Sequence, residues 1–454
     1  MYFFYSFIFA FFITSKSVMG TYQNVPNSND PGEPLLLTPY VESGKIALAQ
    51  NLSKVSPFID GIESYSGFFE VEKQYNSQMF FWFFPAINKN KSAPLILWLE
   101  GGPGVSSLYG LFDEVGPFIL LKNLTIKKRE YSWANNHAVL FIESPVGTGF
   151  SFTNSDAGYS RDEVHIAKLL YSTLIQFFKL FPQYQKNEFF VVGESYAGKF
   201  APAISYAIHT NNPTANIKIN LKGVALGNAY CDPEHMSSGY GDHLYQIGLI
   251  DSNALKYFRA EQAKGVALIK QKRWIDALRL LENLLGTTFY NLTGYTYNFN
   301  FLLDKEEVLF GNVGDLLLNP SVRKAIHVGN VTYDNTIVKV NSFLEEDITQ
   351  SVRPWVETLI EHYRILVYSG QLDLSVPYPN TLGFLNALNW SGKNEYKTAV
   401  RNQWYVNGQL AGYTKTAKKL TEVLVRNAGH LVPADQPYRT YELITRFTSN
   451  QKLV

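Results

Sequence analysis

Short apolar runs, each bounded by turn residues, recur along this chain and indicate its fold. They are six or seven residues long and do not alternate between apolar and polar positions, which is typical of strands buried on both faces of a largely parallel sheet. The runs are APLILWL (93–99), AVLFIE (138–143), FFVVGE (189–194), GVALGN (223–228), RILVYSG (364–370) and EVLVRN (422–427).

Helical patterns separate several of these runs. In DEVHIAKLLYSTLIQFFKLFP (162–182), apolar residues return every three or four positions, as they do on one face of a helix. The alternation of strand, helix and strand implies a doubly wound α/β sheet with helices on both faces.

The interval 232–351 departs from this alternation. It contains helical stretches at 252–286 and 321–329 and an aromatic segment at 289–301, with no obvious run of central strands. An aromatic segment of this kind is more typical of a core than of a substrate pocket. The sequence therefore predicts an α/β core in two parts, 21–231 and 352–454, with a cap or insertion at 232–351 that covers the carboxyl edge of the sheet.

The amino-terminal end predicts export. An apolar run from Tyr2 to Ile13 is too short to span a bilayer and is placed as in a secretory signal, so residues 1–20 are predicted to be a signal peptide. Residues 24–34 (NVPNSNDPGEP) are predicted to be a flexible lead-in. N-x-[ST] sequons, which are glycosylated only in the secretory pathway, occur at Asn51, Asn90, Asn123, Asn291, Asn330 and Asn389.

Composition and charge exclude several classes of function. Of 454 residues, 46% are hydrophobic and only 17% are charged, against roughly 25% charged in soluble proteins generally, so a large buried core is expected. The net charge is +1, and the sequence has no run of lysines and arginines that could bind along a phosphate backbone. Nucleic acid is therefore not expected as a partner. No second apolar run approaches membrane length, so no membrane contact is expected after signal removal. A single cysteine, Cys231, excludes an intrachain disulfide and is interpreted as an inert buried thiol.

Polar and glycine residues follow each predicted strand, at the edge where open α/β sheets bind ligands. They include EGGPGVSS, SPVGTGF, ESYAG, AYCDP, QLDLSVP and AGHLVPADQP. Serine-dependent acyl transfer needs a base for the hydroxyl proton and an acid that orients that base. Ser195, Asp373 and His430 are candidates at three such ends, in the chain order of the α/β-hydrolase fold.

Each candidate has a simpler alternative. Ser195 could be a helix N-cap, and His430 an ordinary loop histidine. Asp373 could form an Asx turn, with Asp232, which also follows a strand, as the acid. The elbow pattern G-x-S-x-G is also imperfect, because Ala197 takes the last position and glycine follows only at Gly198.

The combination of motifs resembles the serine carboxypeptidase family (peptidase family S10) of the α/β-hydrolase fold, and most closely its vitellogenic carboxypeptidase-like members. The resemblance implies a mostly parallel central sheet flanked by helices, with a largely helical cap. The motifs are WLEGGPGVSS (98–107), ESPVGTGFSF (143–152), VVGESYAGKF (191–200), LGNAYCDP (226–233), HLYQIGLID (243–251), VRKAIHVG (322–329), VYSGQLD (367–373) and NAGHLVPADQP (427–437).

The resemblance also implies residue roles. Ser195 is the nucleophile, His430 the general base and Asp373 its orienting acid, while the backbone N–H groups of Gly102 and Tyr196 form the oxyanion hole. No metal or cofactor is implied.

Recognition of the substrate's free carboxylate is implied for Gly101 and Glu194, and Glu114 matches an acid that pairs with Glu194 in some members. The family's Asn or Gln is Glu100 in this chain. Carboxyls converging on a carboxylate must retain a proton, so we expect greater peptidase activity at acid than at neutral pH. Glu100 could instead point away, pair with a Lys or Arg, or mark decayed carboxylate recognition.

The leading functional hypothesis is a secreted or lysosomal carboxypeptidase that releases C-terminal residues from peptides or proteins. A serine carboxypeptidase-like acyltransferase or esterase would keep the same triad, and a binding or protective protein could keep the fold with weak catalysis. The resemblance permits a homodimer.

Overall fold

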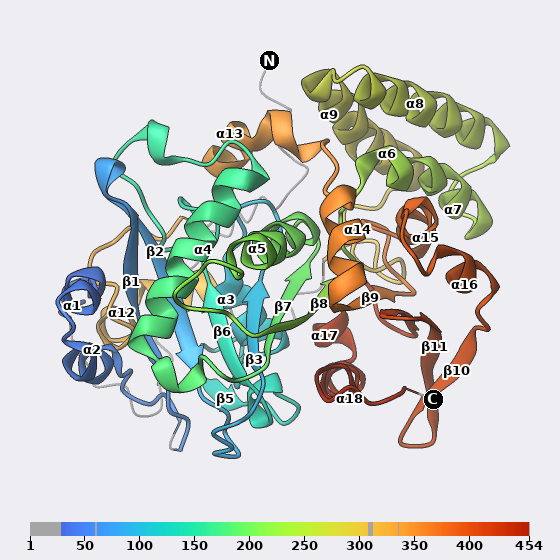
Figure 1. Ribbon diagram of the computed structural model, residues 1–454. Coiled ribbons are helices and arrows are strands. Elements are labelled where there is room, and N and C mark those ends of the chain that lie inside the picture. Colours follow the sequence, from blue (N-terminus) through green and yellow to red (C-terminus); the bar gives the residue numbers. More distant parts are fainter. Residues whose placement is uncertain (1–28, 60, 307–311, 335, 454) are drawn as a thin grey trace.

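A ten-stranded sheet forms the centre of the molecule in the computed structural model, which describes residues 29–59, 61–306, 312–334 and 336–453 (Figure 1). The strands follow the order β1-β2-β6-β3-β7-β8-β9-β12-β11-β10. Their bounds are β1 Tyr65–Glu72, β2 Ser77–Phe84, β3 Leu95–Leu99, β6 Ala138–Ile142, β7 Phe189–Glu194, β8 Leu221–Gly227, β9 Arg364–Gly370, β10 Asn402–Val406, β11 Gln409–Ala417 and β12 Leu420–Val425.

The six predicted apolar runs are the parallel strands of this sheet. β6, β3, β7, β8, β9 and β12 lie side by side and pair in parallel throughout. Every residue of β3, β6 and β7 is buried, as expected for strands covered on both faces. The prediction of a largely parallel α/β sheet is confirmed.

Both edges of the sheet are antiparallel hairpins that lie outside the predicted runs. β1 and β2 extend one edge, and β11 and β10 extend the other. In β10 only part of the strand alternates between exposed and buried positions. No α-helix lies between β1 and β2 or between β10 and β11. The alternation of strands with helices, which predicted the parallel strands, is therefore missing at both edges of the sheet, and the edge strands were not predicted.

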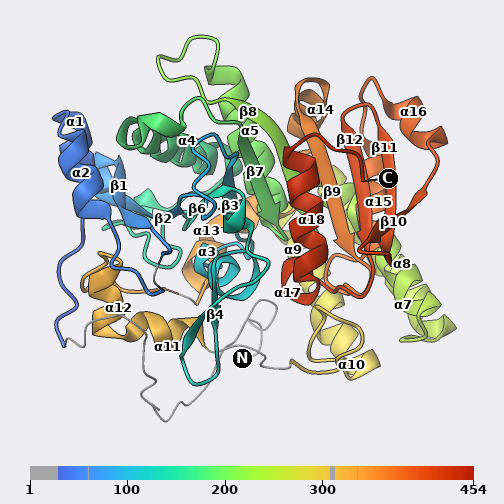
Figure 2. The same ribbon diagram turned by 90° about the horizontal axis from the view of Figure 1, so that it is seen from below.

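Helices cover both faces of the sheet and bury two hydrophobic cores (Figure 2). α4 (Glu163–Leu180), α5 (Ala197–Asn211) and α14 (Arg353–His362) pack on one face. α4 confirms the helical pattern predicted at 162–182, and the Asp162 side chain caps it by accepting a hydrogen bond from the His165 N–H (2.7 Å). The other face carries α3 (Ser107–Tyr109), α11 (Val313–Leu318), α12 (Pro320–Ala325), α17 (Val432–Asp435) and α18 (Pro437–Thr448).

The interval 232–351 is largely helical, and no β-strand is assigned to those of its residues that the structure describes. α6 to α9 gather beside α15, at one end of the molecule in Figure 1, whereas α11 and α12 return to the sheet. The boundaries 232 and 351 remain a prediction. The other helices of this interval are α6 Pro233–Met236, α7 Tyr240–Gln246, α8 Ser252–Lys270, α9 Trp274–Asn283, α10 Phe289–Thr293 and α13 Val338–Ile348, of which α6, α9 and α13 contribute residues to the core on the α4 face of the sheet.

The other described elements include no candidate for a membrane span. Among the described helices, none combines the length and the apolar character needed to cross a bilayer. The predicted signal peptide, residues 1–20, and part of the predicted lead-in, residues 24–28, lie outside the described residues. The remaining helices and strands are α1 Thr38–Glu42, α2 Ile46–Ser53, α15 Tyr378–Ala387, α16 Lys393–Thr398, β4 Phe118–Leu120 and β5 Ile126–Lys128.

Candidate active site

Ser195 lies on a sharp turn between β7 and α5. Its φ of 57° is in the left-handed region, which is uncommon for a residue with a side chain. The Ser195 N–H donates to the Gly227 carbonyl (3.0 Å), and its own carbonyl accepts from Gly198 and Tyr230 (2.9 Å each). No side chain caps α5, so Ser195 does not have the geometry of an N-cap. The turn presents the serine at the carboxyl edge of the sheet.

The departure from the elbow pattern has a steric explanation. Ala197 is fully buried, but the closest contact between the start of α5 and the loop after β8 is made by the next residue, Gly198. A Cβ at Gly198 would lie 2.6 Å from the Ala229 Cβ and 2.7 Å from the Tyr230 nitrogen, on the loop that follows β8. Glycine is therefore required at 198, while 197 accommodates a methyl group.

His430 and Asp373 meet across two loops at the same edge. Asp373 follows β9 and His430 follows β12, and both side chains are about 1% exposed. The His430 Nδ1 lies 2.9 Å from the Asp373 Oδ2, within hydrogen-bonding distance. An aspartate in this position holds an imidazole in one tautomer and one orientation.

Asp373 also forms the Asx turn considered as its alternative. Its Oδ1 accepts hydrogen bonds from the Ser375 N–H (2.7 Å) and the Val376 N–H (3.2 Å), while Oδ2 faces His430. Asp232 is occupied elsewhere, with His235 Nδ1 at 2.7 Å and Arg353 Nε at 3.6 Å from its Oδ2. Of the two strand-end aspartates, only Asp373 contacts His430.

The second ring nitrogen of His430 points to no partner in the described part of the chain. Its Nε2 is buried without a hydrogen bond, so Ser195 and His430 are not hydrogen-bonded in this state. The backbone of His430 is held firmly, since its N–H donates to the Phe299 carbonyl (2.7 Å) and its carbonyl accepts from Asn228 Nδ2 (2.6 Å). Catalytic hydrogen bonds are often long before substrate binds.

The glycine loop after β3 packs directly against the turn of Ser195. A Cβ at Gly101 would lie 2.7 Å from the Tyr196 nitrogen and 2.8 Å from the Ser195 Cβ. Gly102 has a φ of 111°, which other residues rarely adopt. The loop therefore brings its backbone close to the amide that follows Ser195, as an oxyanion hole requires.

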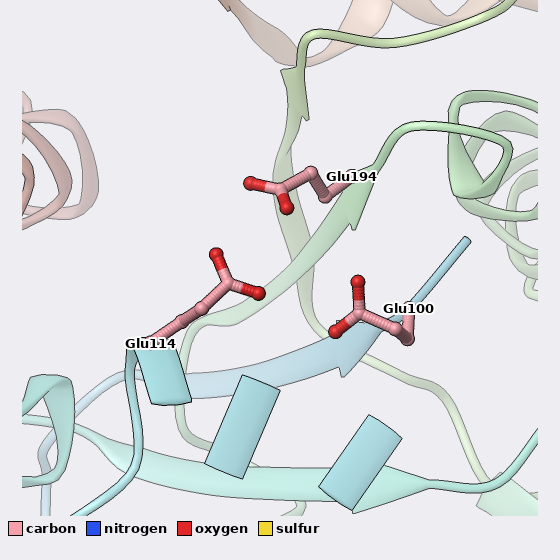
Figure 3. A group of neighbouring side chains, drawn as sticks. All are labelled: Glu100, Glu114 and Glu194. Carbon is pink, nitrogen blue, oxygen red and sulfur yellow. The ribbon is translucent and has the colours of Figure 1, made fainter. Parts of the chain in front are cut away.

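Three glutamates converge beside this loop. Glu100, Glu114 and Glu194 come from the end of β3, a helical turn at 110–114 and the end of β7, and their carboxyl groups face one another (Figure 3). One oxygen from each lies within 4.8 Å of the others, close enough to share protons or a cation. Glu100 thus points into the cluster and not away from it, and its Oε2 accepts from the Trp98 indole N–H (3.0 Å).

Burial and mutual repulsion keep this cluster from ionising fully. Burial raises the pKa of Glu100 to about 7, despite the hydrogen bond from Trp98. Burial, and then the charges of the neighbouring glutamates, raise the pKa values of Glu114 and Glu194 well above the ordinary range. Among the described residues, no lysine or arginine forms an ion pair with any of the three. At least one proton therefore stays in the cluster near neutral pH.

A cavity of about 40 Å³ lies between the core and the interval 232–351. Two of the residues that line it connect it to the site. Tyr230 donates its backbone N–H to the Ser195 carbonyl, and Ser375 lies in the loop of Asp373. The other walls are mainly apolar and come from Met236, Ser237, Tyr240, Gln262, Leu281, Leu284, Leu285, Val376 and Asn380.

The aromatic segment at 289–301 contributes to this site, which its composition did not suggest. Its Asn298 carbonyl accepts from Leu374 and its Phe301 N–H donates to Leu372, on either side of Asp373. The Phe299 ring lies against the His430 ring, with centroids 4.4 Å apart. The segment is thus half-buried against the acid and base loops, and its interpretation as ordinary core was incomplete.

Cys231 and the six sequon asparagines occupy the environments expected for them. Cys231 is fully buried, its thiol contacts the Gly198 carbonyl (3.2 Å), and burial raises the thiol pKa. The sequon asparagines are all exposed: Asn51, Asn90, Asn123, Asn291, Asn330 and Asn389.

Comparisons with known proteins all find carboxypeptidases. A family profile described as serine carboxypeptidase matches residues 56–450. The venom serine carboxypeptidase of Apis mellifera is 49% identical over 437 residues, covering 94% of this chain and 93% of the relative. The probable serine carboxypeptidase CPVL of Homo sapiens is 44% identical over 438 residues, covering 93% and 91%. A crystal structure of Kex1ΔP, a prohormone-processing carboxypeptidase from Saccharomyces cerevisiae, aligns with a TM-score of 0.79 at 25% identity, covering 88% of this chain and 96% of that one.

Proposed function

This chain belongs to the serine carboxypeptidase family and has its α/β-hydrolase fold, and from that premise we propose that it cleaves C-terminal residues through an acyl-enzyme on Ser195. The enzyme is a serine-type carboxypeptidase, a hydrolase that acts on peptides. The contact between His430 Nδ1 and Asp373 Oδ2, beside the strained turn of Ser195, is the observation that most supports these residue roles.

His430 acts through its Nε2. Because Asp373 accepts the Nδ1 proton, Nε2 carries the lone pair that removes the proton from Ser195 as its oxygen attacks the substrate carbonyl. The imidazolium then protonates the leaving amine, which departs as the free C-terminal amino acid. Water attacks the acyl-enzyme in the reverse sequence and restores Ser195.

The N–H groups of Gly102 and Tyr196 stabilise the oxyanion that forms in both steps. The close packing of residues 101–102 against the Tyr196 amide supports this role. Removing one such donor typically costs about 3 kcal/mol of transition-state stabilisation.

Glu100, Glu114 and Glu194, with the N–H of Gly101, bind the substrate's terminal carboxylate. Protonated carboxyl groups donate hydrogen bonds to a carboxylate, whereas ionised ones repel it. The enclosed position of the cluster next to the oxyanion loop supports this assignment.

We expect kcat/KM for a blocked dipeptide to be about tenfold higher at pH 5 than at pH 8, chiefly through KM. Burial raises the pKa of Glu100 to about 7, so Glu100 is protonated at pH 5 and loses its proton as pH rises through that value, while the pKa values of Glu114 and Glu194 are also raised. Glu100→Gln keeps an N–H donor and cannot ionise, so its activity should decline less at alkaline pH. The assay is release of the free C-terminal amino acid from blocked dipeptides.

Glu143→Gln is the matched control, because Glu143 is also a buried glutamate with a raised pKa, but it accepts hydrogen bonds from Ser106 and the Phe150 N–H and lies outside the cluster. Its pH profile should follow the wild type. An activity maximum above neutrality, or a Glu100→Gln profile identical to that of the wild type, would contradict the carboxylate assignment. Ester hydrolysis or acyl transfer without amino acid release would favour the acyltransferase or esterase alternative.

The protein is also proposed to pass through the secretory pathway to the exterior or the lysosome. The exposure of all six sequon asparagines supports this route. Expressed in a eukaryotic cell, the protein should carry N-glycans at most of these positions. Enzymatic removal of the glycans should lower its mass by one glycan for each occupied asparagine. Glycopeptide mass spectrometry, with each Asn→Gln variant as control, measures the occupancy. Unmodified asparagines throughout would rule out this route.

A further inference from the structure

Asn228, at the end of β8, connects the acid and base loops. Its side chain is fully buried and makes three hydrogen bonds. The amide nitrogen donates to the carbonyls of Gly429 (2.9 Å) and His430 (2.6 Å). The amide oxygen accepts from the N–H of Gly370 (2.8 Å), where β9 leads into the Asp373 loop.

The same strand end also holds the nucleophile turn. The carbonyl of Gly227, the residue before Asn228, accepts from the Ser195 N–H (3.0 Å). Two consecutive residues at the end of β8 therefore bond to the segments that carry Ser195, Asp373 and His430. The distance between the serine and the histidine depends on this strand end.

Only a carboxamide satisfies all three bonds of Asn228. Two carbonyls need donors and one N–H needs an acceptor, which a carboxylate, a hydroxyl or an alkyl group of similar size cannot supply together. The site is closed to solvent, so a carbonyl left without a donor would favour movement of the His430 loop.

We propose that Asn228 is a positioning residue that sets the place of the His430 imidazole relative to Ser195 and Asp373. The proposal rests on the roles proposed above for those three residues. Asn228 itself touches none of the reacting atoms and acts through the backbone of residues 370, 429 and 430.

The test compares Asn228→Asp with Asn187→Asp, a control that makes the same substitution at a partly exposed asparagine. Asn187 also donates to two backbone carbonyls, those of Lys91 and Ala93 (2.9 and 2.8 Å), but near the amino ends of β3 and β7, away from the site. Activity is expressed per mole of protein that shows a cooperative thermal unfolding transition, because fluorophosphonate labelling itself depends on the alignment of Ser195 and His430. At pH 7 we expect kcat to fall about 100-fold in Asn228→Asp, with KM within about twofold, and to stay within about twofold in Asn187→Asp.

The pH dependence of kcat distinguishes a positioning role from a merely structural one, which would not make the loss of activity depend on pH. Once protonated, the carboxyl group introduced at position 228 can again donate to one carbonyl, so the kcat of Asn228→Asp relative to wild type should recover about tenfold between pH 7 and pH 4.5. Asn228→Ser, which cannot titrate, should show a similar loss at pH 7 and no recovery, and it provides the test if the aspartate variant does not fold. Equal kcat per mole of folded protein in both position-228 variants and the control would overturn the proposal, whereas a wild type that releases no amino acid would overturn the proposed function itself.

Discussion

Replacing Ser195 with alanine is expected to lower kcat for C-terminal amino acid release by about 10⁶-fold, the size of effect seen when a triad nucleophile is removed. Without the hydroxyl no acyl-enzyme can form, and labelling by a fluorophosphonate should disappear. The variant should fold normally, because alanine fits the same turn and the backbone hydrogen bonds to Gly227, Gly198 and Tyr230 remain. Thermal unfolding alongside the assay on blocked dipeptides checks both expectations.

Ser238→Ala serves as the control, since Ser238 is an exposed serine in the interval 232–351. It should keep its activity within about twofold, as surface substitutions usually do. If Ser195→Ala kept more than about 1% of the wild-type rate, the nucleophile would have to be another residue.

The second large effect is expected for Asp373→Asn, with a loss of about 10⁴-fold in kcat. An asparagine would present an N–H to the His430 Nδ1, which would then become the acceptor, leaving the proton on Nε2. His430 could no longer remove the proton from Ser195. The Asx turn to Ser375 and Val376 would persist through the amide oxygen, so the loop should keep its shape.

Asp232→Asn distinguishes this effect from the general cost of changing a buried strand-end aspartate. Asp232 is also about 1% exposed but contacts His235 and Arg353. Per mole of folded protein, Asp232→Asn should retain at least a tenth of the wild-type kcat. Equal losses in the two variants would mean that the contact between Asp373 and His430 has no special role.

The amino-acid sequence by itself determined the parallel part of the sheet and the edge at which the site lies. Strands such as β3 and β7 are buried on both faces, so their apolar character is continuous and local. The residues that follow parallel strands meet at one edge, and for this reason the positions of Ser195, Asp373 and His430 in the chain were enough to predict that they lie at the same edge. The edge hairpins β1–β2 and β11–β10 lacked this alternation with helices and were missed.

Tertiary structure alone decided which side chains touch. The choice of Asp373 over Asp232, the contact of Phe299 with His430 and the three bonds of Asn228 join segments far apart in the chain. Glu100 was visible as a departure from the family pattern, but its pKa depends on burial beside Glu114 and Glu194, which no local pattern encodes. Periodicity reflects the burial of each segment separately, whereas contacts between loops depend on how the packed sheet and helices bring the ends of those segments together.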